Sequence, residues 1–545
     1  MTLGLDLLNT AIKRNRFGSR DSSIIAKLEA IVAVVGNTLY SKDAPVLTLG
    51  MRCIAGLSKC PLRAMENSIP VVVRQILDTI KQIGSTESDV AQVALKSLAT
   101  ILRDGPPVQV KEKDLVYLLE LISPDLEEPS RQATIFTLLR AIVARKFVVP
   151  EIYDLMESVS KVSVTSQSIQ VQELCRGVLL QFLLDYPQGK GRLRKQMSFF
   201  AKNLTYIHES GRTSIMELLS AVILKFEEAL IVEYAELLFV ALVMVVANDE
   251  SAKCREMAAQ LIKNLWTRLD AERQKVILSH LHTWATQTTQ ILLAWVATQV
   301  YGFLVDVSQA ESSSYVSSIL DDLKVSLQRS SMAFKAIHEN QIGLATEGEP
   351  SWQPAYHSLS VLAKILTVFP DFAVQDDKIE WKYVTEHLIF PHAWVRTAAG
   401  RLLNMLFNVV PATFPRTDRQ DDHPLSMVGM RDVTRKLTQQ LKSEHLDTTQ
   451  NLQIVKNLFY VGKCFDCISL GNSTTGTKDL LDQDEDGEPG ITNEEISISD
   501  SPLPWLFSTL SYQIRSAYIA RRNRSSVKVL IPIIVMCKIL TSSSA

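Results

Sequence analysis

The chain has 545 residues, of which 46% are hydrophobic and 21% are charged, and its formal net charge is −2. A chain of this length exceeds what one ordinary core holds, so it must form several domains or one extended array. The near balance of charge excludes a global positive field that would draw the whole chain onto nucleic acid or an anionic membrane. With 21 Gly and 20 Pro, the composition favours long helices over turn-dense β structure.

Neither disulfide bonds nor membrane insertion are expected. The seven cysteines are an odd number, spread along the chain and set mostly among apolar residues, which is typical of buried thiols in a reducing compartment. Of the two apolar runs, 229–247 contains Glu233 and Glu236, and 529–540 spans only twelve residues. We therefore expect neither run to cross a bilayer.

An internal repeat dominates the first half of the chain. In each copy a short polar turn, often acidic, leads into a segment with small and branched residues at three- and four-residue spacing. The copies begin at Lys42, Glu87, Glu127, Ser168, Glu209, Asp249 and Thr289, so that successive starts are 40 to 45 residues apart. This period is typical of HEAT and armadillo arrays, in which helix pairs stack because each pair has an apolar face that it cannot cover alone.

The period predicts an all-α fold, a HEAT/armadillo-like α-solenoid of stacked helix pairs. Partner helices are expected over 69–83, 113–122 and 232–247, because each has enough apolar residues to face inward. Small residues at the crossing points would let the helix axes approach, and five alanines are candidates for that position: Ala55, Ala94, Ala99, Ala259 and Ala297.

The repeat register is disturbed after Ser308. The predicted organisation is HEAT/armadillo-like repeats over 1–307, an irregular and partly exposed insertion over 308–350, further helical repeats over 351–470, a disordered acidic loop over 471–501, and a C-terminal helix with a divergent tail over 502–545. The acidic stretch carries nine acids against one lysine. Its few apolar residues cannot offset the entropy lost on ordering, which favours disorder.

The stretch LIFPHAWVRTAAGRLLNMLF contains four residues that could form either a site or a turn: Pro391, His392, Trp394 and Arg396. The apolar residues that follow fall at helical spacing, and proline suits the first helical turn. A catalytic His392 would need a carboxylate to polarise it and a nucleophile to act on, and the nearest downstream aspartate is Asp418. We favour the structural interpretation, a turn followed by an inner helix.

Other chemical motifs are weak. Cys464 and Cys467 form a lone CFDC without a second pair, on the face of an expected helix, which favours core packing over a metal site. The acidic run 482–487 resembles a calcium loop but has Asn493 at the twelfth position. The sequence contains no Walker-type loop, HExxH, GxSxG or GxGxxG motif. We therefore predict no catalytic residue, no metal and no cofactor.

Three basic clusters are candidates for contact with RNA. They are Lys13 to Arg16 with Arg20, GKGRLRK from Gly189 to Lys195, and ARRNR over 520–524. The middle cluster follows an expected turn between repeats, where a rigid scaffold could hold four cations against an RNA backbone: Lys190, Arg192, Arg194 and Lys195. The alternative is that these cations cap helix C-termini and solvate a loop.

Four segments carry a family resemblance: Leu183 to Arg212, Asn248 to Ala258, Phe390 to Phe407 and Val455 to Phe465. Together they resemble the carboxyl-terminal region of the U-three-snoRNA-associated, "down-regulated in metastasis" family, whose members are very large HEAT-repeat components of the small-subunit processome. The resemblance runs from near the amino terminus to about Arg522. It implies a non-catalytic nucleolar scaffold that binds processome proteins, pre-rRNA and snoRNA–protein particles, supports pre-rRNA processing and 18S rRNA maturation, and takes neither a membrane nor a small-molecule substrate.

The chain also departs from that family. Family members are several times longer and continue into a Lys-rich tail, whereas this sequence changes character after Asn523. A fragment or a truncated gene model is therefore expected. The alternative function for a solenoid of this kind is an importin- or adaptin-like adaptor that binds peptides or transport factors.

Overall fold

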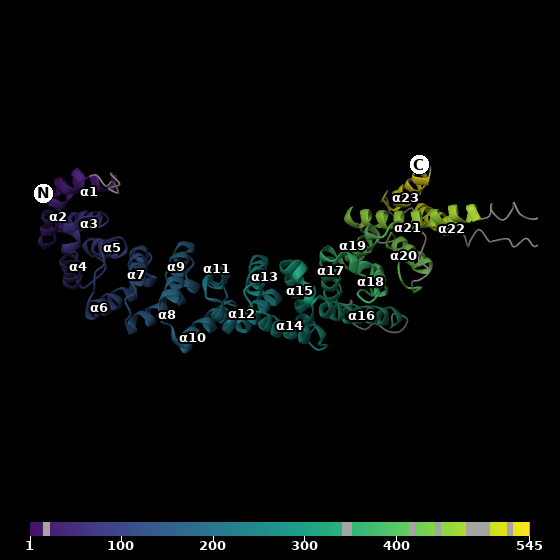
Figure 1. Cartoon of the computed structure of the whole chain (residues 1–545), viewed down its shortest axis with the longest axis horizontal. Helices are drawn as coiled ribbons and strands as arrows, with labels where there is room; N and C mark the ends of the chain where they lie inside the picture. Colours follow the sequence, from purple (N-terminus) through teal and green to yellow (C-terminus); the bar gives the residue numbers. More distant parts are fainter. Residues whose placement is uncertain are drawn as a thin grey trace, which may run out of the picture. The chain divides into compact units, whose positions relative to one another are not determined.

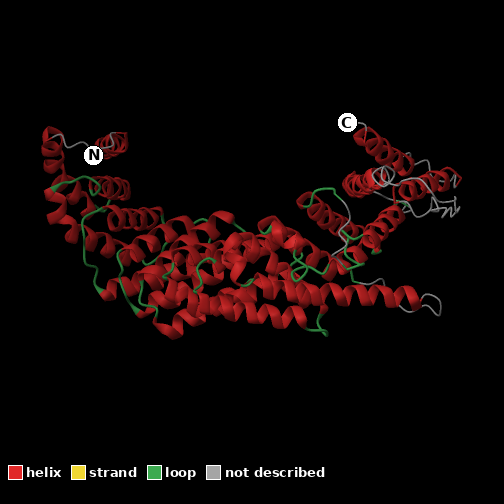
Figure 2. Ribbon diagram, turned by 45° about the vertical axis from the view of Figure 1, so that its right-hand side comes forward, coloured by secondary structure: helices red, strands yellow, loops and turns green. Residues whose placement is uncertain are grey.

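The computed structural model describes residues 1–14, 22–340, 351–413, 420–441, 448–475, 502–519 and 527–543. The chain forms two compact units, Met1–Asp270 and Ala271–Ala545. All regular elements of the described residues are α-helices or short 3-10 helices, with no β-strand among them (Figures 1 and 2). This confirms the all-α prediction. The division between the units falls after Asp270 rather than after residue 307.

The first unit contains thirteen of the described α-helices and two 3-10 helices: α1 (Thr2–Arg14), α2 (Ser22–Asn37), η1 (Thr38–Tyr40), α3 (Ala44–Leu57), α4 (Arg63–Ile83), α5 (Asp89–Asp104), α6 (Glu112–Ile122), η2 (Ser123–Glu127), α7 (Gln132–Ala144), α8 (Pro150–Thr165), α9 (Ile169–Asp185), α10 (Gly189–Asn203), α11 (Glu209–Lys225), α12 (Glu228–Asn248) and α13 (Ala252–Trp266). The predicted partner helices correspond to α4, α6 and α12.

The second unit contains ten of the described α-helices and three 3-10 helices: α14 (Ala271–Thr286), α15 (Ile291–Ser308), η3 (Gln309–Ser314), α16 (Val316–Asn340), α17 (Gln353–Val368), η4 (Pro370–Val374), α18 (Trp381–Glu386), η5 (His387–Ile389), α19 (Ala393–Val409), α20 (Met427–Gln440), α21 (Thr448–Thr475), α22 (Pro502–Ile519) and α23 (Val527–Ser543).

The helices of each unit stack in two layers. In the first unit the odd-numbered helices from α1 to α13 pack each against the next, and in the second unit α15, α17, α19, α21 and α23 do the same. The even-numbered helices form the other layer, in which α2 packs on α4, α6 on α8, and α10 on α12 (Figure 1). Each of the seven predicted copies of the repeat contains the start of one odd-numbered helix, from α3 to α15. We call the odd-numbered helices the inner helices.

Small residues are buried at the inner helices as expected, with one exception. Ala94, Ala99 and Ala297 are fully buried, and Ala55 is nearly so. In α13 the helix buries Ala258 and leaves Ala259 partly exposed. The prediction was one residue off because Ala258 and Ala259 are adjacent, and helical periodicity alone does not fix the phase of a short stretch.

A side-chain hydrogen bond recurs at the starts of the inner helices. In five inner helices the fourth residue reaches back over six positions and donates to a carbonyl oxygen of the preceding turn, which has no partner within a helix. The donors and acceptors are Gln92 to Thr86 (2.8 Å), Gln172 to Ser166 (2.8 Å), Arg212 to Tyr206 (2.9 Å), Arg255 to Asp249 (2.6 Å) and Arg396 to Phe390 (2.9 Å). In these five helices the bond helps to fix the angle at which the chain enters the inner helix.

The expectation of an irregular insertion over 308–350 is wrong for most of that stretch. Residues 309–314 form η3 and residues 316–340 form the long helix α16, while 341–350 lie outside the described residues. The many serines conceal an apolar stripe at helical spacing, because Val316, Ile319, Leu320, Leu323 and Leu327 are all buried.

The predicted acidic loop mostly lies outside the described residues. Helix α21 continues to Thr475, which is five residues into the stretch that was expected to be a loop. Residues 476–501 are not described. Disorder over that stretch therefore stays a prediction.

Two stretches of the described chain are long and apolar enough to cross a membrane by length and composition, α12 and Ile291–Ser314. The apolar window of α12 is 50% buried within its unit, and that of the second stretch is 44% buried. Helix α12 packs on α10 and α13, and α15 packs on α14 and α17. Packing on these neighbours accounts for the buried part of each apolar window.

Candidate functional site

The basic cluster 189–195 occupies the first turns of α10 in the even-numbered layer. Gly189 adopts a φ of 59° in the left-handed region, which favours glycine, and the helix begins there directly after the turn that follows α9. The next residues wind onto one and a half helical turns, so the cations spread around the helix axis. The side chain of Lys190 lies outside the described part of the chain.

Two of the three described cations of this cluster are engaged by α8. The guanidinium carbon of Arg192 lies 4.1 Å from the centre of the Tyr153 ring, a cation–π contact. The ammonium of Lys195 lies 2.6 Å from a carboxylate oxygen of Glu157. Arg194 is exposed. The contacts with α8 hold these two side chains in place, although of the two only Lys195 is paired with an opposite charge.

The other two basic clusters are described only in part. Lys13 and Arg14 end α1, whereas Arg16, Arg20 and residues 520–524 lie outside the described residues. Lys13 contributes to a groove that is taken up below.

The segment from Pro391 to Arg396 forms the turn before α19 and its first residues. His392 is the N-cap residue, and its Nδ1 accepts from the backbone N–H of Trp394 at 3.3 Å. Its ring also stacks on Trp352, with centroids 4.4 Å apart. Arg396 donates to the carbonyl oxygens of Phe390 and Pro391. These contacts fit a structural turn.

Trp394 differs from the other three residues of the segment. Its side chain is 56% exposed, although its spacing had placed it with the apolar residues of the helix. It contacts Trp352 edge-on, with centroids 5.0 Å apart, and borders a groove of about 510 Å³ that Tyr356 and Arg401 also line. The inner helix α19 thus carries an aromatic surface that the helical pattern alone does not distinguish from core.

The two cysteines of the CFDC segment lie on α21. Cys464 is buried, and burial raises the pKa of its thiol to about 12, so that the thiolate that a metal would need is strongly disfavoured. Cys467 is partly exposed and its Sγ lies 3.7 Å from the carbonyl oxygen of Ala412. No group of three or more metal-ligating side chains occurs among the described residues.

A histidine–aspartate pair lies elsewhere in the second unit and has no local sequence signal. Nδ1 of His282 in α14 lies 2.7 Å from Oδ1 of Asp322 in α16, whose other oxygen accepts from the Tyr301 hydroxyl at 2.6 Å. Burial raises the pKa of Asp322 above its ordinary value. In the described chain no hydroxyl or thiol is hydrogen-bonded to Nε2 of His282, so the pair lacks the nucleophile of a catalytic triad. It joins three helices of the stack.

Comparison with known proteins identifies relatives of this chain. No protein-family model matches it. It is 31% identical over 446 residues to the U3 small nucleolar RNA-associated protein 20 of Schizosaccharomyces pombe, which covers 81% of this chain and 17% of the relative. It is 30% identical over 403 residues to the protein of the same name from Saccharomyces cerevisiae, which covers 74% of this chain and 15% of the relative.

The chain is homologous to a segment of U3 small nucleolar RNA-associated protein 20. This confirms the family resemblance drawn from the four motif segments. The chain spans about one-sixth of the length of these curated relatives, so the activity and partners of the whole proteins are matters for proposal.

Solved structures with a similar arrangement are karyopherins. A chain from a Kap95p–RanGDP structure has a TM-score of 0.42 at 11% identity, covering 98% of this chain and 66% of that chain. Importin beta has a TM-score of 0.38 at 10% identity, covering 98% of this chain and 62% of that chain. Such low scores carry no argument about function, and the fold assignment rests on the helix layers themselves.

Proposed function

We propose that this chain is a non-catalytic architectural component of the small-subunit processome, the 90S pre-ribosome. In this role it binds processome proteins, pre-rRNA and snoRNA–protein particles in the nucleolus and supports pre-rRNA processing and 18S rRNA maturation. The observation that carries the proposal is the similarity to proteins named for association with U3 small nucleolar RNA over 74% and 81% of this chain.

The arrangement of the helices supports a binding role. Stacked helix pairs leave long edges and inner surfaces open to partners, and each pair contacts only its neighbours, so that many partners can bind along one stack. Among the described residues, the pair that most resembles catalytic machinery, His282 with Asp322, has no nucleophile beside it. Within the α10 cluster, Arg194 is the described cation best placed to meet RNA, because Arg192 and Lys195 already contact α8.

The adaptor alternative has less support. Its only basis is the shared pairing of helices with karyopherins at TM-scores below 0.5. Capture of Ran or of nuclear-targeting peptides by the purified chain would favour it.

The proposal is tested by expressing the tagged 545-residue chain in cells and measuring the U3 small nucleolar RNA and 18S precursor that co-purify with it. Strong enrichment of both over an unrelated small nucleolar RNA is expected. Co-purification no greater than with an unrelated helical-repeat protein of similar charge would contradict the proposal.

A further inference from the structure

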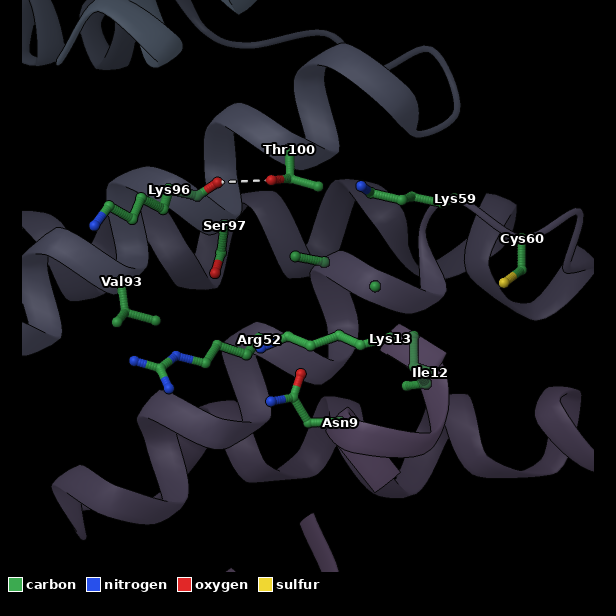
Figure 3. Close-up of a pocket in the computed structure, with 12 residues that line it drawn as sticks. Asn9, Ile12, Lys13, Arg52, Lys59, Cys60, Val93, Lys96, Ser97 and Thr100 are labelled. Atoms are coloured by element: carbon green, nitrogen blue, oxygen red, sulfur yellow. Dashed lines mark hydrogen bonds between the residues drawn. The ribbon is translucent and has the colours of Figure 1, made fainter. Parts of the chain in front are cut away.

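The inner helices α1, α3 and α5 enclose a groove of about 650 Å³ (Figure 3). Helix α1 packs on α3, and α3 packs on α5, so the groove runs across three successive inner helices of the first unit. Four of its lining residues are cations, contributed by α1, α3, the turn after α3, and α5: Lys13, Arg52, Lys59 and Lys96. None of the described lining residues has a carboxylate side chain.

Three of these cations are free to meet an anion. Lys59 lies 3.2 Å from a carboxylate oxygen of Asp104. Lys13, Arg52 and Lys96 are exposed and have no ion-pair partner in the described part of the chain. Three unpaired positive charges around one concave surface focus a positive potential there, although the chain as a whole is slightly acidic.

Two polar side chains of low exposure also line the groove. Asn9 in α1 is 5% exposed and Ser97 in α5 is 3% exposed. Neither has a fully buried polar atom that lacks a hydrogen-bond partner. Figure 3 draws the Asn9 amide beside the side chains of Lys13 and Arg52. The Asn9 amide and the Ser97 hydroxyl can therefore add hydrogen bonds to a ligand that the cations attract to the groove.

We propose that this groove binds the phosphodiester backbone of RNA without reading its sequence. The free cations neutralise phosphates, and the Asn9 amide and Ser97 hydroxyl can bond to phosphate oxygens or to the 2′-hydroxyl. The inference rests on the proposed function and assigns it a contact site. No aromatic ring lines the groove in the described residues, so base stacking is not expected and all bases bind alike.

The lining favours RNA over an acidic protein segment. Its apolar members are Ile12, Ala55, Cys60 and Val93, and all but Ile12 are buried. Peptide binding depends on apolar or aromatic anchors that fill pockets, and such pockets are not formed by these side chains. A polyanion whose charge repeats along its length fits cations that recur from one inner helix to the next.

The test compares two double variants of the full chain that change net charge equally. Arg52→Glu with Lys96→Glu reverses two charges in the groove, whereas Arg74→Glu with Lys27→Glu reverses two exposed charges on α4 and α2, neither of them ion-paired in the described chain. Affinity for a fluorescent 12-nucleotide oligouridylate is measured by anisotropy over a salt series. The groove variant is expected to bind at least about tenfold more weakly, with a shallower salt dependence, and the control within about threefold.

A charge-neutral variant separates binding from general electrostatics. Asn9→Leu removes an amide that lines the groove without changing the net charge, so RNA affinity is expected to fall about threefold while the melting temperature changes little. A side chain with a purely structural role would lower the melting temperature without weakening RNA binding by the folded protein. Circular dichroism confirms that each variant is folded.

Several outcomes would overturn the groove site. Equal weakening by both double variants would mean that only net charge matters. Binding of an oligoglutamate of equal charge as tightly as the oligouridylate would assign the groove to an acidic protein segment. Failure of the proposed function would give a different result. If U3 RNA does not co-purify from cells, but the groove variant of the purified chain still loses affinity for the oligouridylate, only the processome role is contradicted.

Discussion

Basic side chains lie both in the first turns of the inner helices and in the groove over α1, α3 and α5, but the fold pairs the two sets to different degrees. Arg212, Arg255 and Arg396 donate to backbone carbonyl oxygens, whereas Lys13, Arg52 and Lys96 are exposed and unpaired. A cation is therefore available to a ligand only where the surrounding repeats supply no carbonyl or carboxylate oxygen to bind it.

Arginines at the ends of the inner helices also link one repeat to the next. Arg212 of α11 donates to Asp249 in the turn before α13 at 2.9 Å, and the pair is largely buried. Arg268 donates to the carbonyl oxygens of Ile223, Leu224 and Phe226 at the end of α11. Such bonds satisfy the orphan groups of helix ends and fix the stacking of neighbouring pairs. Lys13, Arg52 and Lys96 make no comparable bond in the described chain, so they contribute charge rather than stability.

The largest expected difference between the arginines at the helix starts and the groove cations is in their contribution to the free energy of unfolding. Arg212→Leu leaves buried Asp249 and two turn carbonyls without their partner, and we expect it to lower the free energy of unfolding by about 4 kcal/mol. Arg52→Leu, in the groove, is expected to change it by less than about 0.5 kcal/mol. Urea unfolding followed by circular dichroism measures both, and equal losses would refute the distinction.

The fold also contains a basic side chain, that of His357, which it keeps neutral. His357 of α17 stacks on Trp295, with centroids 5.0 Å apart, and burial, aided by the charge of Lys364, lowers its pKa from 6.5 to about 4. Between these values the unfolded chain binds more protons than the folded chain, so stability is fully present above pH 6.5 and is lost as pH falls towards 4.

His357→Phe keeps an aromatic ring on Trp295 and removes this titration. Relative to the variant, the wild-type chain is expected to lose about 2 kcal/mol of unfolding free energy between pH 7 and pH 4.5. Parallel curves of stability against pH for the two proteins would show that His357 is already accessible to protons in the folded state.

A smaller effect is expected at Gln172, an uncharged side chain that makes the same bond to a turn carbonyl oxygen. Gln172 is buried and donates to the carbonyl oxygen of Ser166, in the turn before α9, at 2.8 Å and to that of Ser210, in the first turn of α11, at 3.2 Å. Gln172→Met keeps the length of the side chain and removes both bonds. The Ser210 oxygen still accepts from the Thr213 hydroxyl at 3.0 Å, so the loss falls mainly on Ser166 and is expected to cost about 1 kcal/mol. Thermal unfolding measures it, and an unchanged midpoint would imply that water replaces the amide.

The repeat pattern predicted the helix layers, because each apolar face recurs every 40 or so residues and has to be covered by a neighbour. It failed at α16, where serines conceal the apolar stripe, and at Trp394, whose spacing fits the core although its ring is largely exposed. The groove was missed because its cations are far apart in sequence. Lys13, Arg52 and Lys96 nevertheless follow one another at about the repeat period, which is the signal that could have found them.

The smallest effect is expected at the α10 cluster, the densest run of cations that the structure describes in part. Its partners Tyr153 and Glu157 precede it by some 40 residues, on a helix that only the fold brings close. Because these contacts occupy Arg192 and Lys195, replacing both by Gln is expected to weaken oligouridylate binding by less than about threefold, and stability by about 0.5 kcal/mol or less, since exposed ion pairs contribute little. Anisotropy titration beside Arg52→Gln with Lys96→Gln supplies the matched comparison. A larger loss from the α10 pair than from the groove pair would reverse the assignment, and would mean that RNA displaces Glu157 and Tyr153 from their cations.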